Sequence, residues 1–415
     1  MSQSLQQSSA TVPQGRQRIN PRILLLALGM FALGTDAFVV AGVLPTIAKE
    51  TGVTESVAGQ LVTVFSLTYG LGAPLFAALA GRWRPTRVLI GSLGLFFLAN
   101  VASALSPSFL LLLLTRVLAG CFAATYAPLA YTVGISLAPP AKRGQALALV
   151  VIGLTVATAL GSPLGTWVGE HFGWRMSFAL VALLAGIAVL SLLIGGLPEV
   201  AAPKSLPLKT RLAPIAQPRV VMALLPSLLW NIGGFTVYTY IAILLLHNLH
   251  ISDISGLLVA YGAGVVAGNW SGGLMADRFG TRRLLVFYLV ALVIIEAVLS
   301  LLISNMIAGI VMLFLLGLGI SQLFIPQQHR LLSVAPEHAN VILALNNSAF
   351  YLGIAGGALV GGLALRVVPV SQLGWIGSAF VLLALLLFLL SLRAGKSRPL
   401  ATADKETQKV LIAPE

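Results

Sequence analysis

The chain has 415 residues, of which 58% are hydrophobic and 9% are charged. A soluble domain carries about 25% charged residues, so this composition excludes a soluble globular protein and indicates a chain that lies mostly in lipid. The formal net charge is +13, and the one cysteine, Cys121, excludes a disulfide framework and a cysteine-based metal site.

Twelve apolar runs of roughly 18–25 residues follow one another along the chain, and each is long enough to cross a hydrocarbon core of ~30 Å. They predict transmembrane helices over residues 23–47, 57–80, 88–105, 109–134, 146–168, 177–197, 220–246, 254–276, 284–303, 306–327, 341–364 and 374–392. The connections between them are short, so we expect no soluble catalytic domain between the spans. Residues 1–21 are polar and lack the apolar core of a cleaved signal peptide.

Positive charge is distributed unevenly between alternate loops. If the N-terminus lies in the cytoplasm, 21 of the 25 Lys and Arg side chains fall on the inner side. Lys49, Arg175 and Arg366 fall on the outer side, and Arg116 lies within a span. This asymmetry satisfies the positive-inside rule. We therefore expect both termini in the cytoplasm, and anionic lipid headgroups rather than nucleic acid as partners of the basic loops.

A polar segment rich in Pro, Lys and Arg divides the spans into two groups of six. The expected order is an N-terminal tail, a six-helix bundle, a cytoplasmic linker, a second six-helix bundle and a C-terminal tail, over residues 1–22, 23–197, 198–219, 220–392 and 393–415. A shift of 196 residues also aligns the halves, placing Arg82 on Arg278, Arg87 on Arg283, Gly161 on Gly357 and Gly165 on Gly361. We expect an all-α membrane protein with two pseudo-symmetric bundles and a substrate site between them at the midplane.

One carboxylate and one guanidinium interrupt the apolar spans of the first half. Asp36 and Arg116 both lie ~20 Å from the inner ends of their antiparallel spans, at 1.5 Å per residue. The two side chains can therefore meet at one depth, where an isolated charge costs at least a few kcal/mol. Pairing favours the ionised carboxylate and burial favours the neutral acid, so this pair can load and release a proton. The alternative is a static ion pair that fixes helix packing.

The second half has no equivalent ion pair, because the shifted positions are Ile232 and Met312. Its carboxylate at depth is Glu296, in the ninth span, for which a structural role, a protonated state on the lipid side and a coupling role all stay open. Polar and aromatic side chains at helical spacing predict a cavity for a small, moderately apolar solute. The candidates are Phe38, Tyr126, Asn231, Phe235, Tyr238, Gln322, Asn347 and Tyr351. Hydrogen bonds between helices are the alternative role for the amides.

The loop between the eighth and ninth spans reads GLMADRFGTRR, over residues 273–283. It resembles the G-x-L-A-D-R-x-G-R-R signature of the major facilitator superfamily, and the residues concerned are Gly273, Asp277, Arg278, Gly280, Arg282 and Arg283. The resemblance implies a role in gating; the alternative is a turn with ordinary cytoplasmic arginines. The equivalent first-half loop departs from the signature, because Gly81 replaces its Asp and Arg84 its Gly.

Two spans of the first half resemble those of the twelve-span drug:proton antiporters in this superfamily. RVLAG, over residues 116–120, resembles an R-x-x-x-G element whose arginine is associated with proton coupling. ALGSPLGTWVG, over residues 159–169, resembles the glycine-rich antiporter motif, with tight helix packing as its alternative role. Its motif residues are Gly161, Pro163 and Gly165. The Ser162 between them is similar to a variant of the sugar-efflux, nucleoside-efflux and chloramphenicol-resistance branch.

The resemblance implies a proton-coupled exporter of a small organic solute, such as a drug-like compound, a nucleoside or a sugar, that rocks its two halves. An importer or a facilitative uniporter on the same fold is the alternative. The sequence offers no catalytic constellation, so we expect no enzyme, and no cofactor besides the proton as coupling ion. The expected partners are the substrate, protons and membrane lipids. We further expect a monomer in a bacterial cytoplasmic (inner) membrane.

Overall fold

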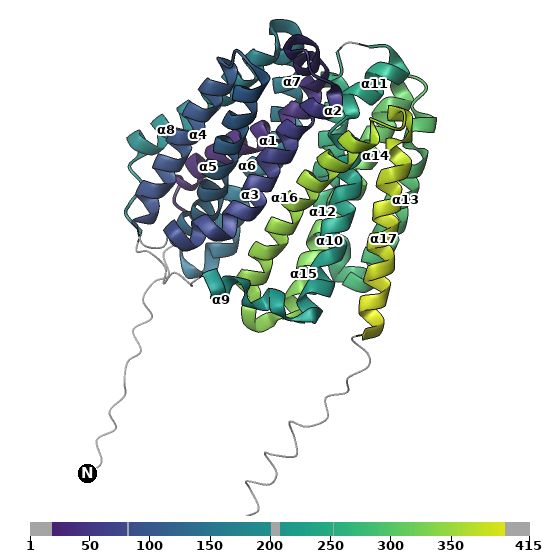
Figure 1. Ribbon diagram of the computed structural model, residues 1–415. Helices are drawn as coiled ribbons and strands as arrows, with labels where there is room; N and C mark the ends of the chain where they lie inside the picture. Colours follow the sequence, from purple (N-terminus) through teal and green to yellow (C-terminus); the bar gives the residue numbers. More distant parts are fainter. Residues whose placement is uncertain (1–18, 81–82, 201–207, 252, 395–415) are drawn as a thin grey trace, which may run out of the picture.

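Two bundles of long helices stand side by side in the computed structural model, which describes residues 19–80, 83–200, 208–251 and 253–394 (Figure 1). Helices α1 to α8 form the first bundle, and helices α10 to α17 form the second. The part of the chain that is described contains helices and no strand. The expected all-α fold of two helical bundles is therefore confirmed.

The fifth span of the first bundle is broken in its middle. A π-helical segment, Ala157–Gly161, stands directly before Ser162 and Pro163. Pro163 has no N–H for the helix ladder, and single-turn π-segments are frequent at functional sites. The helices of this bundle are α1 (Ile23–Thr51), α2 (Glu55–Ala58), α3 (Gln60–Ala80), α4 (Pro85–Ala104), α5 (Phe109–Ser136), α6 (Arg143–Val156), α7 (Ser162–Phe172) and α8 (Trp174–Gly195).

The second bundle has two broken spans. The seventh span changes direction at Thr239 and Tyr240, and the tenth span changes direction at Leu323. The helices of this bundle are α10 (Pro218–Tyr238), α11 (Ile241–Leu249), α12 (Ser255–Phe279), α13 (Thr281–Leu302), α14 (Met306–Gln322), α15 (Phe324–Val334), α16 (Ala339–Ala364) and α17 (Leu373–Ala394). A short helix, α9 (Leu208–Leu212), belongs to the expected linker, of which residues 201–207 lie outside the described residues.

The helices occupy the positions that the apolar runs predict. Within the described ranges, ten helical stretches are long and apolar enough to cross a membrane, by length and composition alone. The two remaining expected spans, 57–80 and 254–276, are occupied by α3 and α12. The structure is therefore consistent with the twelve spans expected from the sequence.

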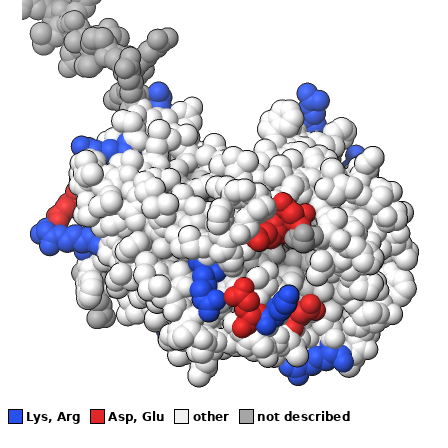
Figure 2. Space-filling view, turned by 90° about the horizontal axis from the view of Figure 1, so that it is seen from above, with Lys and Arg blue, Asp and Glu red and all other residues white. Residues whose placement is uncertain are grey.

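Polar contacts join the two bundles at the end opposite the linker. Ser56 on α2 donates its hydroxyl to the carbonyl oxygen of Gly362 on α16, and Arg366 Nε lies 3.3 Å from Ser56 Oγ. The backbone N–H of Ile254 donates to Glu170 Oε1, at the end of α7, at 3.0 Å. Figure 2 looks down on this end and shows acidic and basic side chains gathered near its middle. In this conformation the bundles are closed at the end away from the linker.

Candidate functional site

The structure brings Asp36 and Arg116 together inside the first bundle. Arg116 Nη1 donates to Asp36 Oδ1 at 2.6 Å, and Arg116 Nη2 lies 3.4 Å from the backbone oxygen of Asp36. Neither residue is exposed at all. The depth argument from the sequence therefore predicted this contact between α1 and α5, as a geometry.

The ion pair is left partly unsatisfied. Asp36 Oδ2 and Arg116 Nε have no hydrogen-bond partner among the residues that the structure describes. The guanidinium lies over the ring of Phe65, 4.3 Å from its centroid, and 5.6 Å from the centroid of Phe178. The side chain of Asn100 on α4, whose Nδ2 donates to Phe96 O, lies beside the Asp36 carboxylate. Arg116 is thus held by aromatic rings, while one carboxylate oxygen stays available for a proton.

Glycines of the fifth span allow that span to lie directly against α1 beside Asp36. A Cβ at Gly161 would collide with Thr35, and a Cβ at Gly165 would lie 2.6 Å from Val39 Cγ2. Small residues permit this close approach of helices in a membrane. The glycines of the expected antiporter motif therefore have a packing role in this structure, next to the candidate proton site.

Ser162, in the same motif, connects the two bundles. Its hydroxyl donates to the backbone oxygen of Phe38 at 3.2 Å and lies 3.4 Å from the hydroxyl of Tyr238. The π-helical segment also contacts the second bundle here, because Gly262 on α12 packs against the backbone of Ala159. The break in the fifth span thus lies where α1, α10 and α12 meet.

An aromatic cluster at this junction includes three of the cavity candidates. The rings of Phe38 and Phe235 have centroids 6.1 Å apart, and those of Phe235 and Tyr238 have centroids 5.7 Å apart. Tyr238 also lies against Tyr261 on α12, at 4.4 Å. The rings of the cluster come from both bundles and are buried, so they are positioned to contact a solute held between the bundles.

The cluster continues through α16 to α3. Phe350 lies 6.0 Å from Phe235 and 5.3 Å from Tyr351, and Tyr351 stacks on Tyr69 at 3.6 Å. Tyr69 in turn lies 6.4 Å from Phe65, the ring beneath Arg116. A chain of aromatic rings therefore leads from the ion pair of the first bundle to the centre of the second. We call these eight rings the aromatic chain: Phe65, Tyr69, Tyr351, Phe350, Phe235, Phe38, Tyr238 and Tyr261.

The other cavity candidates lie in hydrogen bonds or at the edge of the cluster. The Tyr126 hydroxyl donates to Leu26 O at 3.0 Å, which joins α5 to α1. Asn231 Nδ2 donates to Ser227 O within α10, and Gln322 Nε2 donates to Ser271 Oγ on α12. Asn347 is half-buried, one turn before Tyr351 on α16. In this conformation Gln322 makes the interhelical bond that is the alternative role for the amides, and Tyr126 makes a bond of the same kind.

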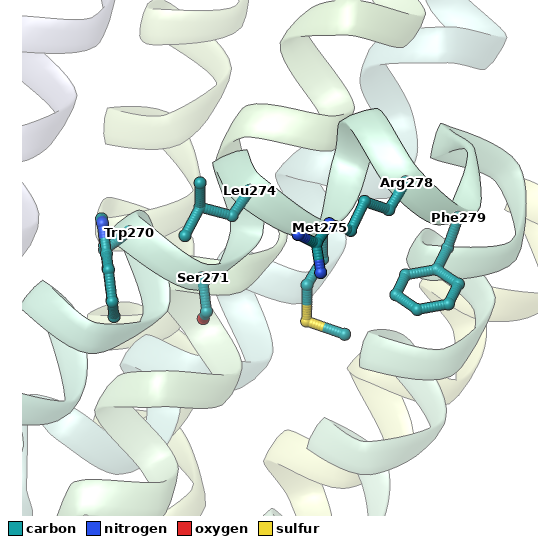
Figure 3. Close-up of a pocket in the computed structure, with 6 residues that line it drawn as sticks. All are labelled: Trp270, Ser271, Leu274, Met275, Arg278 and Phe279. Atoms are coloured by element: carbon teal, nitrogen blue, oxygen red, sulfur yellow. The ribbon is translucent and has the colours of Figure 1, made fainter.

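The residues of the second-half signature loop lie at the end of α12 and the start of α13. Gly280 has a φ of 77°, a backbone conformation that favours glycine, and Gly273 packs against Ile325. Arg278, Arg282 and Arg283 are exposed, and the side chain of Asp277 lies outside the part of the structure that is described. Beside this loop, a pocket of about 340 Å³ is lined by Trp270, Ser271, Leu274, Met275, Arg278 and Phe279 (Figure 3).

The first-half loop uses a carboxylate from the linker. Glu199 accepts hydrogen bonds from Arg84 Nη1, at 2.6 Å, and from Arg87 Nε, at 3.0 Å. The hydrogen bond from Arg84 holds the pKa of Glu199 below its usual range, with Arg87 as a further cause. Gly81, which stands where the signature has its Asp, lies outside the described residues.

Sequence reasoning did not single out Phe65, Tyr69 or Phe350, and it treated Ser162 only as a motif variant. Phe65 and Tyr69 lie at i and i+4 on α3, a spacing that places both on one helix face. That signal was present, but apolar and aromatic residues cover every face of these spans. The contacts of Ser162 depend on the π-helical segment, which the sequence did not predict.

The comparisons with known proteins agree with the fold. A family model described as Major Facilitator Superfamily matches residues 26–358. The inner membrane transport protein YdhP of Escherichia coli (strain K12) is 35% identical over 384 residues, which cover 91% of this chain and 97% of YdhP. A chloramphenicol resistance protein of Streptomyces lividans is 37% identical over 261 residues, which cover 62% of this chain and 67% of the relative.

A solved structure supports the architecture. A mutant of the nucleoside transporter NupG superposes with a TM-score of 0.69 at 13% identity, covering 89% of this chain and 98% of the NupG chain. At that identity the likeness shows the fold alone. Together with the family model and with relatives above 30% identity, it establishes that the chain belongs to the major facilitator superfamily of membrane transporters.

Proposed function

We propose that this transporter exports a small organic solute in exchange for protons. The observation that carries the proposal is the fully buried ion pair of Asp36 and Arg116, in which one carboxylate oxygen has no partner in the described part of the chain. A charged carboxylate at this depth is energetically costly, so its presence marks a functional site by default. Asp36 is the proposed proton carrier, and Arg116 is the cation that stabilises its ionised form.

Proton binding at Asp36 would change the electrostatics of the junction. A neutral Asp36 leaves the charge of Arg116 without an anion, beside the rings of Phe65 and Phe178 and the backbone oxygen of Asp36, so the contact of α1 with α5 weakens. Because α1 also packs on the fifth span through Gly161 and Gly165, the change reaches the junction with the second bundle. This is the proposed link between proton loading and the rocking of the two halves.

The aromatic chain supports a small, moderately apolar organic substrate. Large rings with a few neutral polar groups are typical of small-molecule sites, and the carboxylate nearest to them is already paired with Arg116. The relative named for chloramphenicol resistance favours export over uptake. We extend this to neutral solutes of drug, nucleoside or sugar type.

The proposed orientation has both termini in the cytoplasm of a bacterial inner membrane, with the closed end of the structure outside. The basic loops then face anionic headgroups, and the pocket of Trp270 and Arg278 lies at the inner interface, where lipid is the proposed partner. Arg143→Cys in a Cys121→Ser background should resist a membrane-impermeant thiol reagent in intact cells, and Ser304→Cys should react. Labelling of Arg143→Cys from outside would reverse the orientation.

Transport into everted membrane vesicles tests the proposal. With an imposed proton gradient, the wild type should accumulate at least one compound from a panel of chloramphenicol, nucleosides and sugars. Asp36→Asn should abolish accumulation of the compound against its own concentration gradient. The substitution removes the titratable group and nearly preserves the shape of the side chain. Glu50→Gln is the matched control, since Glu50 is a carboxylate of α1 whose partners, Trp174 and Arg175, belong to its own bundle.

The direction of transport is decided by comparing everted with right-side-out vesicles. Accumulation in right-side-out vesicles only, driven by an inward proton gradient, would favour the importer. Accumulation by Asp36→Asn at the wild-type level would remove Asp36 from the coupling mechanism.

A further inference from the structure

Glu296 lies in the middle of α13 with none of its side chain exposed. Neither of its carboxyl oxygens has a hydrogen-bond partner among the described residues. The side chain enters the crossing of α10 and α17, where Gly233 and Gly377 leave room for it. A Cβ at Gly377 would lie 2.6 Å from Glu296 Oε2, so the absence of a side chain there admits the carboxyl group.

The surroundings of Glu296 are neutral. The helices α10 and α17 carry Arg219 and Arg393 at their inner ends, and α13 carries Arg282 and Arg283 at its own inner end, far along the helix from this crossing. Arg330 on α15, which also packs against α13, donates to Ser391 near the inner end of α17, and α14 carries no charged residue. The polar neighbours are Ser378 on α17, whose hydroxyl donates to Val293 O, and Ser300, one turn along α13. An ionised carboxylate without a cation is so unfavourable in this setting that the group binds a proton instead.

The internal repeat relates this position to the ion pair of the first half. The shift of 196 residues places Asn100 on Glu296, and Asp36 on Ile232. Asn100 is fully buried on α4, and its side chain lies beside the Asp36 carboxylate of α1. Glu296 lies against Gly233, the residue after Ile232. Each bundle therefore has one buried carboxyl group where its first and third spans approach each other, supplied by the first span in one half and by the third span in the other.

We propose that Glu296 is a second proton-binding site of this transporter, placed in the C-terminal half at the pseudo-symmetric counterpart of the Asp36 site. In the conformation described here it holds a proton. Movement of α10 against α17 opens the crossing to water, and the carboxyl group then gives its proton to that water and becomes a carboxylate. The inference rests on the proposed proton coupling and adds a second proton to each transport cycle.

Infrared difference spectroscopy on the whole transporter tests the site without a substrate. Protein labelled with carbon-13 glutamate shifts the carboxylic-acid band of Glu296 away from that of Asp36. We expect a labelled acid band at neutral pH that disappears as pH is raised. Burial raises the pKa of Glu170 to about 8, so Glu170 has a labelled acid band of its own, and the measurement is made in a Glu170→Gln background. In that background the band should be absent when Glu296→Gln is added, which keeps the shape of the side chain, and present when Asp36→Asn or the outer control Glu55→Gln is added.

Flux measurements give the second readout. The number of protons moved per substrate molecule in reconstituted vesicles should fall about twofold in Glu296→Gln, because one of two sites no longer titrates. An acid band that no pH change removes, or an unchanged proton number in Glu296→Gln, would overturn the second site. Should Glu296→Gln fail to fold, the labelled band of Glu170→Gln alone still decides whether Glu296 is a titrating or a permanently neutral acid.

The two proposals fail separately. If Asp36→Asn loses proton-driven transport while Glu296→Gln keeps the wild-type proton number, only the second site is wrong. If Asp36→Asn itself transports protons and substrate normally, the proposed function of the first site is wrong.

Discussion

The two bundles share their helix packing but differ in what they place at its centre. In the first bundle, Gly161 and Gly165 pack the fifth span against α1. In the second, Gly357 and Gly361 pack α16 against α10, at positions related by the internal repeat. The close approach of these helices is therefore a property of both halves, and glycine alone does not identify the functional one.

The charges distinguish the halves. Asp36 and Arg116 form a fully buried ion pair in the first half, and the equivalent positions in the second are Ile232 and Met312. The second half keeps a single unpaired acid at this depth, Glu296. In the first half Arg116 stabilises the ionised form of Asp36, so that this carboxyl group can exist with or without its proton. Glu296 has no such cation among the described residues, and its ionised form is disfavoured. This difference supports the proposal that the first half has the primary coupling role.

Removal of the cation should have the largest effect. Arg116→Ala leaves Asp36 buried without its partner, which should destabilise the protein by about 3–5 kcal/mol and abolish transport or shift its pH profile. Arg116→Lys keeps the charge but loses the planar group over Phe65, so it should keep partial activity. Thermal unfolding and transport at several pH values measure both effects. Met312→Ala, at the equivalent position in the second half, should leave the pH profile of transport unchanged. A wild-type pH profile in Arg116→Ala would contradict the proposed difference between the halves.

Alanine at matched glycines should have an intermediate effect. A Cβ at Gly161 would meet Thr35 and a Cβ at Gly357 would lie 2.6 Å from Ile232 O, so each variant should lose about 1–3 kcal/mol of stability. Gly161→Ala should also move the pH profile of transport, because it displaces the helix that carries Asp36. Gly357→Ala should leave the pH profile unchanged, although its Cβ would also meet Phe235 of the aromatic chain. Equal shifts of the pH profile in both variants would show that the halves couple to protons alike.

The inner loop of the first half should show the smallest effect. Arg84 lowers the pKa of Glu199, so their contact stabilises the protein above the ordinary pKa of glutamate and loses this contribution as pH falls through the lowered pKa. The pair is exposed, so salt screens it. Glu199→Gln should leave the midpoint of thermal unfolding nearly unchanged at neutral pH, and added salt should remove any difference. A large fall in the unfolding midpoint of Glu199→Gln at high salt would contradict this prediction, because it would show that the exposed contact stabilises the fold substantially.

The order and length of the spans could be predicted from the sequence because a bilayer imposes both. The pairing of Asp36 with Arg116 could also be predicted, since their depths follow from the rise per residue in two antiparallel spans. Those two constraints act along the membrane normal, where a helix has little freedom. They explain why the described helices match the apolar runs so closely.

Contacts within the membrane plane could not be predicted in the same way. Tyr69 stacks on Tyr351 across the two bundles, and which faces meet depends on how the halves pack in one conformation. In apolar spans every face carries large side chains, so periodicity does not select the one that faces the partner. The role of Ser162 depends on a local π-helical turn, for which the sequence offered only Pro163 as a signal.

The central claim is that Asp36 carries the coupling proton, and substrate-induced proton release from detergent-solubilised protein tests it most directly. The measurement follows the pH of a weakly buffered sample while substrate is added, at several starting pH values. Wild-type protein should release protons over the pH range in which transport is active. Asp36→Asn should lose the major part of this release while it still binds substrate, because the aromatic chain is intact. Undiminished release from Asp36→Asn would place the coupling proton elsewhere and contradict the account.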